Sequence, residues 1–136
     1  IHQNNQPEAL IRCKAFRREN RQPLNYDEVG QVEVGGEMVS VTTEIRKARC
    51  KDQGYICAYT MLRIDVSSSH NEHLVPRSKS KASGNIEETL DYGNIVACYP
   101  GEEKRGGTGF GATLRGDVDL VLTPMDPACE VRLKFD

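Results

Sequence analysis

Apolar and polar residues alternate along much of this chain, and a period of two is typical of half-buried β-strands. Residues 31–34 alternate in this way, residues 39–46 do so again, and the glycine pair 35–36 lies between the two segments. Two consecutive glycines between alternating runs predict a two-residue hairpin, because both central positions of such a turn need a positive φ. The turn would place Val32 opposite Val39, on the shared apolar face of the hairpin.

The chain after this first hairpin fits a second one. If residues 53–54 form its loop, Cys50 faces Cys57 across the two strands, at a separation that a disulfide can bridge. The same register matches apolar residues and opposite charges across the pair. We therefore predict a meander over residues 31–66. The sequence leaves open whether Cys50 and Cys57 pair with each other or with other cysteines.

Strand character continues toward the C-terminus. Apolar residues alternate in residues 89–99, 110–123 and 129–135, with turn-forming residues between these segments. Residues 8–20 fit either a strand or a basic helix, and we interpret them as a strand. Six or seven half-buried antiparallel strands predict an all-β fold, arranged as a sandwich or a barrel. A chain of 136 residues is long enough for a single domain, 1–136, with its own core.

Residues 67–88 differ from the rest because they are rich in Ser, His, Lys and other polar or turn-forming residues. Long loops without regular structure are uncommon in small domains and are usually mobile or functional. We therefore expect a long polar loop in this part of the chain. Loops on a rigid β-scaffold commonly carry binding sites.

The cysteine content points to a particular compartment. The chain has five cysteines spread over its length: Cys13, Cys50, Cys57, Cys98 and Cys129. They form no Cys-x-x-Cys motif and no close cluster with His, so no zinc site is expected. We therefore expect a disulfide framework made in an oxidising compartment. The odd count leaves one thiol free or paired with another chain through an intermolecular disulfide.

The start of the chain and its net charge narrow the class further. The first residue is Ile1 rather than Met, which favours a mature secreted chain whose signal peptide has been removed, with a piece of a larger protein as the alternative. No apolar run approaches the roughly 20 residues that span a bilayer, so membrane insertion is not expected. The net charge of -2 gives no reason to expect nucleic acid as a partner.

His70, Glu72 and His73 lie close together in the polar segment, where they could bind a metal or act as an acid–base pair. They lack a third ligand at a recognisable spacing, so a solvated loop is the favoured interpretation. A small secreted ribonuclease would need a late His, whereas His2, His70 and His73 all precede the C-terminal strands and none falls on a predicted strand. We therefore expect no catalytic site, no metal and no cofactor.

Basic residues make up the candidate binding set, since clustered positive charge can contact acidic partner surfaces. Its members are Arg12, Lys14, Arg17, Arg18, Arg77, Lys79 and Lys81. A solvated charged surface is the alternative, because acidic residues offset these charges over the whole chain. The tripeptide at residues 115–117 matches an integrin-binding motif, but it falls within the predicted strand 110–123 rather than at a loop tip, so we do not take it as a site.

Spread cysteines, strand alternation and the missing catalytic set together resemble small cysteine-containing secreted proteins of fungi, in particular effectors and allergens that act at host surfaces. The segments Gly54–Ser69 and Gly116–Pro124 are similar to the β-barrel allergen family of Alternaria-type moulds. The spacing of the cysteines departs from that family. The resemblance implies a secreted protein that recognises a partner rather than one that turns over a substrate.

The function implied by this resemblance is that of a virulence effector without enzymatic activity, with a host protein or surface receptor as its partner. Two alternatives stay open. One is a small secreted hydrolase of the ribonuclease type. The other is an extracellular cystine-linked signalling ligand, since residues 32–57 resemble Toll-activating cystine-knot proteins although the closing Cys-x-Cys pair is absent.

Overall fold

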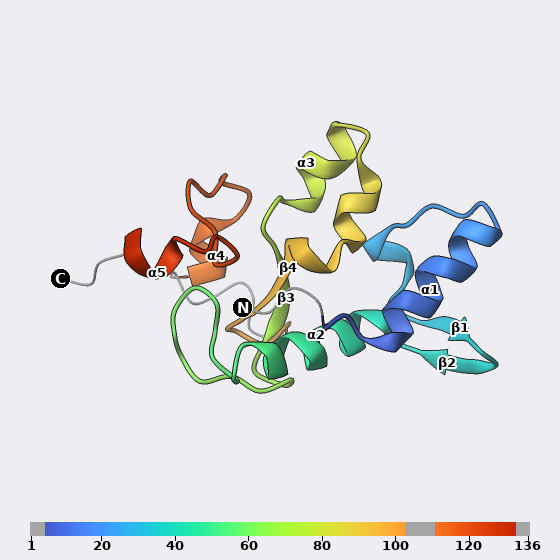
Figure 1. Cartoon of the computed structure of the whole chain (residues 1–136), viewed down its shortest axis with the longest axis horizontal. Helices are drawn as coiled ribbons and strands as arrows, with labels where there is room; N and C mark the ends of the chain where they lie inside the picture. The colour runs from blue at the N-terminus through green and yellow to red at the C-terminus, as the bar shows by residue number, and fades with distance from the viewer. Residues whose placement is uncertain (1–4, 103–110, 133–136) are drawn as a thin grey trace.

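A computed structural model describes residues 5–102 and 111–132 of the chain. In this part, α-helices and two small antiparallel sheets are joined by turns and short 3-10 helices (Figure 1). The elements are α1 (Glu8–Glu19), η1 (Tyr26–Glu28), β1 (Val32–Val34), β2 (Glu37–Val39), α2 (Val41–Asp52), β3 (His70–His73), α3 (Arg77–Ala82), η2 (Ile86–Leu90), η3 (Tyr92–Asn94), β4 (Ile95–Cys98), α4 (Gly111–Arg115) and α5 (Cys129–Arg132). The structure is about 42% helical, so the predicted all-β sandwich or barrel is wrong.

The first hairpin forms as the sequence predicts. β1 and β2 pair antiparallel with Val32 opposite Val39 and Val34 opposite Glu37. Gly35 and Gly36 have φ values of 60° and 86°, the left-handed backbone that the two-residue turn needs. The hairpin stands at one end of the molecule beside α1 (Figure 1).

The predicted second hairpin is wrong because its first strand is the helix α2. Val41, Ile45 and Arg49 are spaced four residues apart and are all buried on one face, which is the spacing of a helix. The Oγ of Ser40 accepts a hydrogen bond from the backbone N–H of Thr43 at 3.3 Å and caps the first turn. When apolar residues occupy every second position of a short stretch, some of them are also four residues apart, which is the spacing of a helix.

Residues 8–20, interpreted as a strand, form the helix α1. Its buried residues are Leu10, Cys13 and Arg17, spaced three and four apart along one face. Glu8 in the first turn and Arg18 in the last turn complement the helix dipole. Local propensity and charge thus favour the helix over the short alternation that the strand interpretation used.

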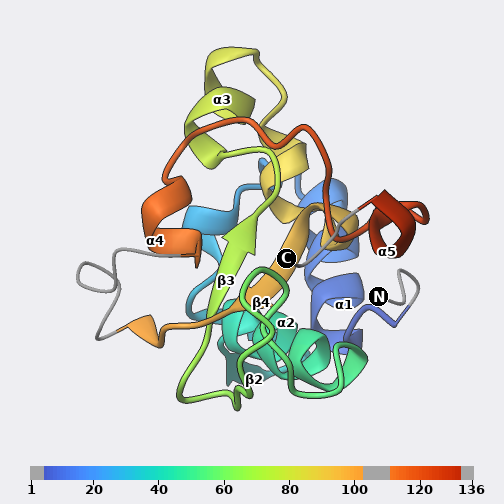
Figure 2. The same cartoon turned by 90° about the vertical axis from the view of Figure 1, so that its left-hand side faces the viewer.

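β3 and β4 form the second sheet, which α2 packs against at the centre of the molecule (Figure 2). They pair antiparallel with His70 opposite Cys98 and His73 opposite Ile95, and every residue of both strands is buried. The strand predicted over residues 89–99 is confirmed only for residues 95–98, because residues 89–94 lie in the 3-10 helices η2 and η3 and the turn between them. The predicted polar loop over residues 67–88 is wrong, because it contains β3, α3 and the start of η2.

The predicted C-terminal strands are also wrong where the structure describes them. Residues 111–115 and 129–132 form the short helices α4 and α5, with turns between them. Residues 110 and 133–135, which the predicted strands included, lie outside the described residues. The predicted barrel or sandwich therefore loses its last two strands as well.

Two clusters of buried side chains hold these elements together. The first joins α1, the segment after it, the hairpin, α2 and the chain up to the start of β4 through Leu10, Cys13, Leu24, Val29, Val34, Val41, Ile45, Leu90, Tyr92 and Ile95. The second joins the end of α2, β4 and α4 through Cys50, Cys57, Ile64, Leu74, Val96, Ala97, Cys98 and Ala112. The hairpin is thus fixed against α1 by the first cluster, which positions the groove described next.

Candidate functional site

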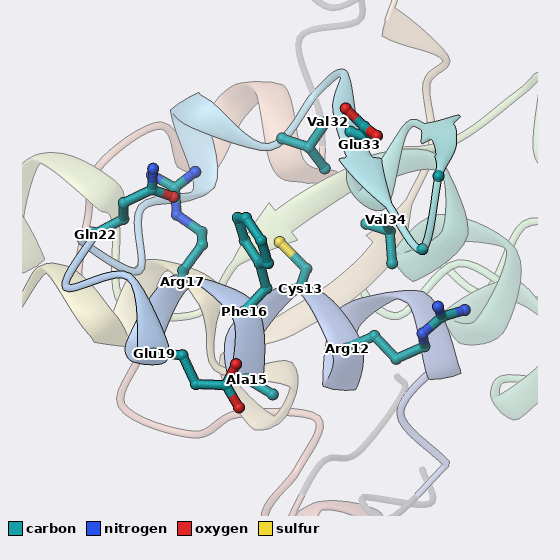
Figure 3. Close-up of a pocket in the computed structure, with 12 residues that line it drawn as sticks. Arg12, Cys13, Ala15, Phe16, Arg17, Glu19, Gln22, Val32, Glu33 and Val34 are labelled. Carbon is teal, nitrogen blue, oxygen red and sulfur yellow. The ribbon is translucent and has the colours of Figure 1, made fainter.

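A groove of about 750 Å³ runs between α1 and the β1–β2 hairpin (Figure 3). Its lining comprises Arg12, Cys13, Ala15, Phe16, Arg17, Glu19 and Gln22 from α1 and the turn after it, and Val32, Glu33, Val34, Gly35 and Gly36 from the hairpin. Ligand pockets in proteins commonly have volumes of about 300–1,000 Å³. The groove is therefore large enough to hold several side chains of a partner.

The floor of the groove is apolar. Cys13 and Val34 are buried in the first core cluster, and Val32 packs partly against it. Phe16 points from α1 toward the hairpin and is 53% exposed (Figure 3). A large aromatic side chain that stays half exposed in a concave surface leaves apolar area that a partner can cover.

The two ends of the groove carry arginines with different surroundings. The guanidinium of Arg12 lies over Gly35, where a Cβ would come within 1.9 Å of its Nη2. Arg12 makes no ion pair with the residues that the structure describes. Arg17 is buried instead, where its Nε donates to the carbonyl of Pro23 at 2.7 Å and its Nη2 lies 3.3 Å from Glu28. Among the described residues, Arg12 is thus the basic lining residue without an ion pair, and the acidic lining residues Glu19 and Glu33 have none either.

The rest of the predicted basic set lies elsewhere and faces acidic residues of the same chain. Lys14 and Arg18 line a separate depression together with Glu87, Glu88 and Asp91. The structure therefore divides the basic residues of α1 between two faces of the helix.

The basic residues of α3 are paired within the chain. Arg77 and Lys81 both form ion pairs with Asp27, and Lys79 lies 2.6 Å from Asp119. The predicted set thus contributes only Arg12 and Arg17 to the groove. Phe16 was not among the residues selected from the sequence. The one sign of a role for it in the sequence was an aromatic residue among several basic ones.

The predicted solvated loop around His70 is instead a buried polar network. Glu72 accepts from Arg115 Nη1 at 2.9 Å and lies 3.2 Å from the Nε2 of His70. The Nδ1 of His70 lies 2.6 Å from the carbonyl oxygen of Pro100. Arg115 also donates to the carbonyl oxygens of His73 and Leu74, so it ties α4 to β3.

This network offers little to a substrate. A small polar pocket of about 120 Å³ borders Glu72, His73 and Arg115. The guanidinium of Arg115 is occupied by Glu72 and backbone carbonyls, and so it is not presented to a phosphate. His70 and His73 lie on the strand β3, so the expectation that neither histidine falls on a strand, which weighed against a ribonuclease, is wrong. Even so, we interpret the network as a structural link between β3 and α4.

His73 makes the stability of the fold depend on pH. Burial lowers its pKa to about 4, and its Nε2 lies 2.8 Å from the carbonyl oxygen of Thr89. Because the unfolded chain binds this proton near its ordinary pKa of about 6.5, stability is full above that pH and falls as the pH drops toward 4. We expect a loss of about 2 to 3 kcal/mol between pH 6.5 and 4.5 from this residue.

The measurement is urea unfolding of the wild type and His73→Gln at several pH values in that window. Gln cannot titrate but can still donate to Thr89. The variant should show a clearly smaller loss of unfolding free energy on acidification than the wild type. Equal slopes for the two proteins would show that His73 does not carry the effect.

All five cysteines are free thiols in the structure, so the predicted disulfide framework is wrong. Cys50, Cys57 and Cys98 are fully buried and behave as part of the second core cluster. The sulfur of Cys57 accepts from the backbone N–H groups of Thr60 and Tyr99 at 3.4 and 3.3 Å. A hydrogen bond from the Cys98 thiol lowers the pKa of Cys57 to about 4, whereas burial raises the pKa of Cys98.

No group of three or more His, Cys, Asp or Glu side chains in residues 5–102 and 111–132 is arranged to hold a metal ion. Over the same residues, no helix has the length and apolar character needed to cross a membrane. Comparison with protein-family models, with curated proteins and with solved structures found no match to this chain.

Proposed function

We propose that this protein is a non-enzymatic interaction module that binds a segment of a partner protein in the groove between α1 and the β1–β2 hairpin. The observation that carries the proposal is the half-exposed ring of Phe16 over an apolar floor, with the guanidinium of Arg12, which pairs with no acidic residue in the described part of the chain, at one end. An apolar anchor site with a charged rim is the common arrangement of protein-recognition surfaces. Secretion and a role in virulence, which the resemblance implies, stay predictions.

The energetics of the groove suit a modest, specific interaction. Complete burial of a Phe side chain contributes about 1.5 to 3 kcal/mol relative to full exposure, so covering the exposed half of Phe16 contributes roughly 1 kcal/mol. A hydrogen bond from the Arg12 guanidinium to a carboxylate adds about 1.5 to 3 kcal/mol. These two contacts, with backbone contacts along the groove, support micromolar rather than picomolar affinity.

The experiment is selection of random dodecapeptides displayed on phage against the purified protein, followed by measurement of Kd for the tightest peptide by fluorescence anisotropy. The test variant is Phe16→Asp. The matched control is Met61→Asp, because Met61 is also apolar and 63% exposed but lies in the segment after α2, outside the groove. We expect at least a tenfold weaker Kd for Phe16→Asp and less than a twofold change for Met61→Asp.

Both positions are exposed, so neither variant should unfold the protein, and far-UV circular dichroism checks this directly. If no peptide is selected, or if the two variants weaken binding equally, the groove is not the recognition site. If Met61→Asp alone weakens binding, the partner surface lies on the segment after α2 instead.

A further inference from the structure

We propose that the groove receives its partner as an added β-strand on the open edge of β1, with an acidic side chain of that strand against Arg12. The inference rests on the proposed function of the groove and specifies the chemistry of its ligand. The expected partner segment is an extended peptide with apolar residues at alternate positions and one acidic residue opposite Arg12.

The open edge follows from the register of the hairpin. In a two-residue hairpin the pair that closes the turn exchanges backbone hydrogen bonds, which here is Val34 with Glu37. Hydrogen-bonded and non-hydrogen-bonded pairs alternate along an antiparallel ladder, so Glu33 and Met38 form a non-hydrogen-bonded pair. The backbone N–H and C=O of Glu33 therefore point away from β2, at the outer edge of β1.

That edge pairs with no other strand of residues 5–102 and 111–132, and it opens into the groove. The sheet that contains β1 has two strands in the described part of the chain, and β2 is the other one. Glu33 lines the groove, and α1 forms the opposite side (Figure 3). An exposed strand edge is a template for an extended peptide, which gains main-chain hydrogen bonds from it.

Side chains along the added strand would fall alternately toward the core and toward solvent. Those on the inner face would lie near Phe16 and Cys13, so apolar residues are favoured at every second position. Side chains at the outer positions would face water, so their identity would have little effect on binding. A ligand with this alternation matches the apolar floor of the groove.

The position of one acidic side chain in the ligand follows from Arg12, whereas Glu19 and Glu33, which also line the groove, disfavour further acidic residues. Its guanidinium lies at the turn end of the groove over Gly35, without an ion pair from the described residues. A carboxylate on the added strand at this end would accept from it in a charge-assisted hydrogen bond. The bond would also fix the register of the strand along β1.

The first experiment measures amide hydrogen exchange by NMR with the tightest dodecapeptide from the phage selection as the probe. The hairpin supplies its own control, because the amides of Glu33 and Met38 are both outward-facing and lie on opposite edges. We expect saturating peptide to slow exchange of the Glu33 amide at least tenfold and to leave the Met38 amide within twofold of its free rate.

The second experiment tests the charge. Arg12→Glu should weaken binding of the selected peptide at least tenfold, and replacing the acidic residue of the peptide by Lys should restore binding to the variant. Arg18→Glu is the matched control, since Arg18 lies on the same helix but faces the separate depression. Weakening that the peptide swap does not restore would overturn the contact between Arg12 and the ligand carboxylate.

The outcomes separate the inference from the proposed function. If binding needs Phe16 but the Glu33 amide exchanges as fast as before, the strand addition is wrong and the groove remains the recognition site. If Glu33 is protected without peptide, in step with protein concentration, a second copy occupies the edge and the inference is overturned. If no peptide binds in a manner that depends on Phe16, the proposed function fails and the inference fails with it.

Discussion

Replacing Arg49 by Ala is expected to lower the free energy of unfolding by about 3 to 5 kcal/mol, because it removes one partner of a buried charge pair. Arg49 is 0% exposed, its guanidinium lies 3.6 Å from the centre of the Tyr92 ring, and its Nη1 lies 3.6 Å from Asp52. Its Nη2 donates to the carbonyl oxygen of Tyr92 at 2.5 Å. The substitution leaves the carboxylate of Asp52 and this carbonyl buried without their cation.

Urea unfolding at neutral pH measures this change. The control is Lys47→Ala, because Lys47 is on the same helix and its 3.0 Å pair with Glu44 is exposed to solvent. Exposed pairs of this kind contribute about 0 to 0.5 kcal/mol. If Arg49→Ala lowers the free energy of unfolding no more than the control does, the buried contacts of Arg49 with Tyr92 and Asp52 do not stabilise the fold as expected.

The second large effect is expected at Glu72. Glu72→Ala leaves the guanidinium of Arg115 and the ring of His70 buried without their carboxylate, and we expect a loss of about 3 to 5 kcal/mol in the free energy of unfolding. The side chains of Glu72 and Arg115 are 10% and 7% exposed, so water cannot replace the lost contacts well. Glu72→Gln keeps an acceptor for Arg115 and should cost less.

The control for Glu72 is Asp119→Ala, which removes the exposed partner of Lys79. That variant should change the unfolding free energy by less than about 0.5 kcal/mol. The same urea titrations provide both values. A loss at Glu72 as small as that at Asp119 would mean that β3 is not tied to α4 by this network.

The β1–β2 hairpin and β4 could be predicted because local sequence decides them. Two adjacent glycines fit a backbone turn that other residues enter at a cost, and they set the pairing of Val32 with Val39. Residues 95–98 are an apolar run that is buried on both faces of the second sheet. Neither element needs information from distant parts of the chain.

α2 was missed because alternation and helical spacing coincide over a few residues. Val41 and Ile45 are separated by four positions, which satisfies a period of two and a helix equally well. The deciding signals were Ser40 as an N-cap and Arg49, which extends the buried spacing by one more turn. A charged residue in that position does not look like part of a core until Tyr92 and Asp52 are placed around it.

β3 could not be predicted from its own residues. Its sequence is entirely polar, and polar groups are buried only when partners satisfy their hydrogen bonds. Those partners, among them Arg115 and the carbonyl oxygens of Thr89 and Pro100, come from distant segments. The strand is therefore a consequence of tertiary structure rather than of pattern.

The same limit applies to the candidate site and to the cysteines. The basic residues of α1 could be recognised in the sequence. Which of them line the groove and which lie on another face depends on how the helix packs. The cysteine count favoured disulfides, although a buried free cysteine also behaves as a small apolar residue. Four of the five are buried in the two core clusters.

If a partner binds between α1 and the hairpin as proposed, NMR chemical-shift mapping will place the bound peptide there. Adding the selected dodecapeptide to the isotopically labelled protein should shift the backbone amides of residues 12–19 and 32–36 most. Amides in residues 55–62 and around the polar pocket at residues 71–77 should stay unchanged. The largest shifts in either of those regions, with the groove unaffected, would contradict binding in the groove.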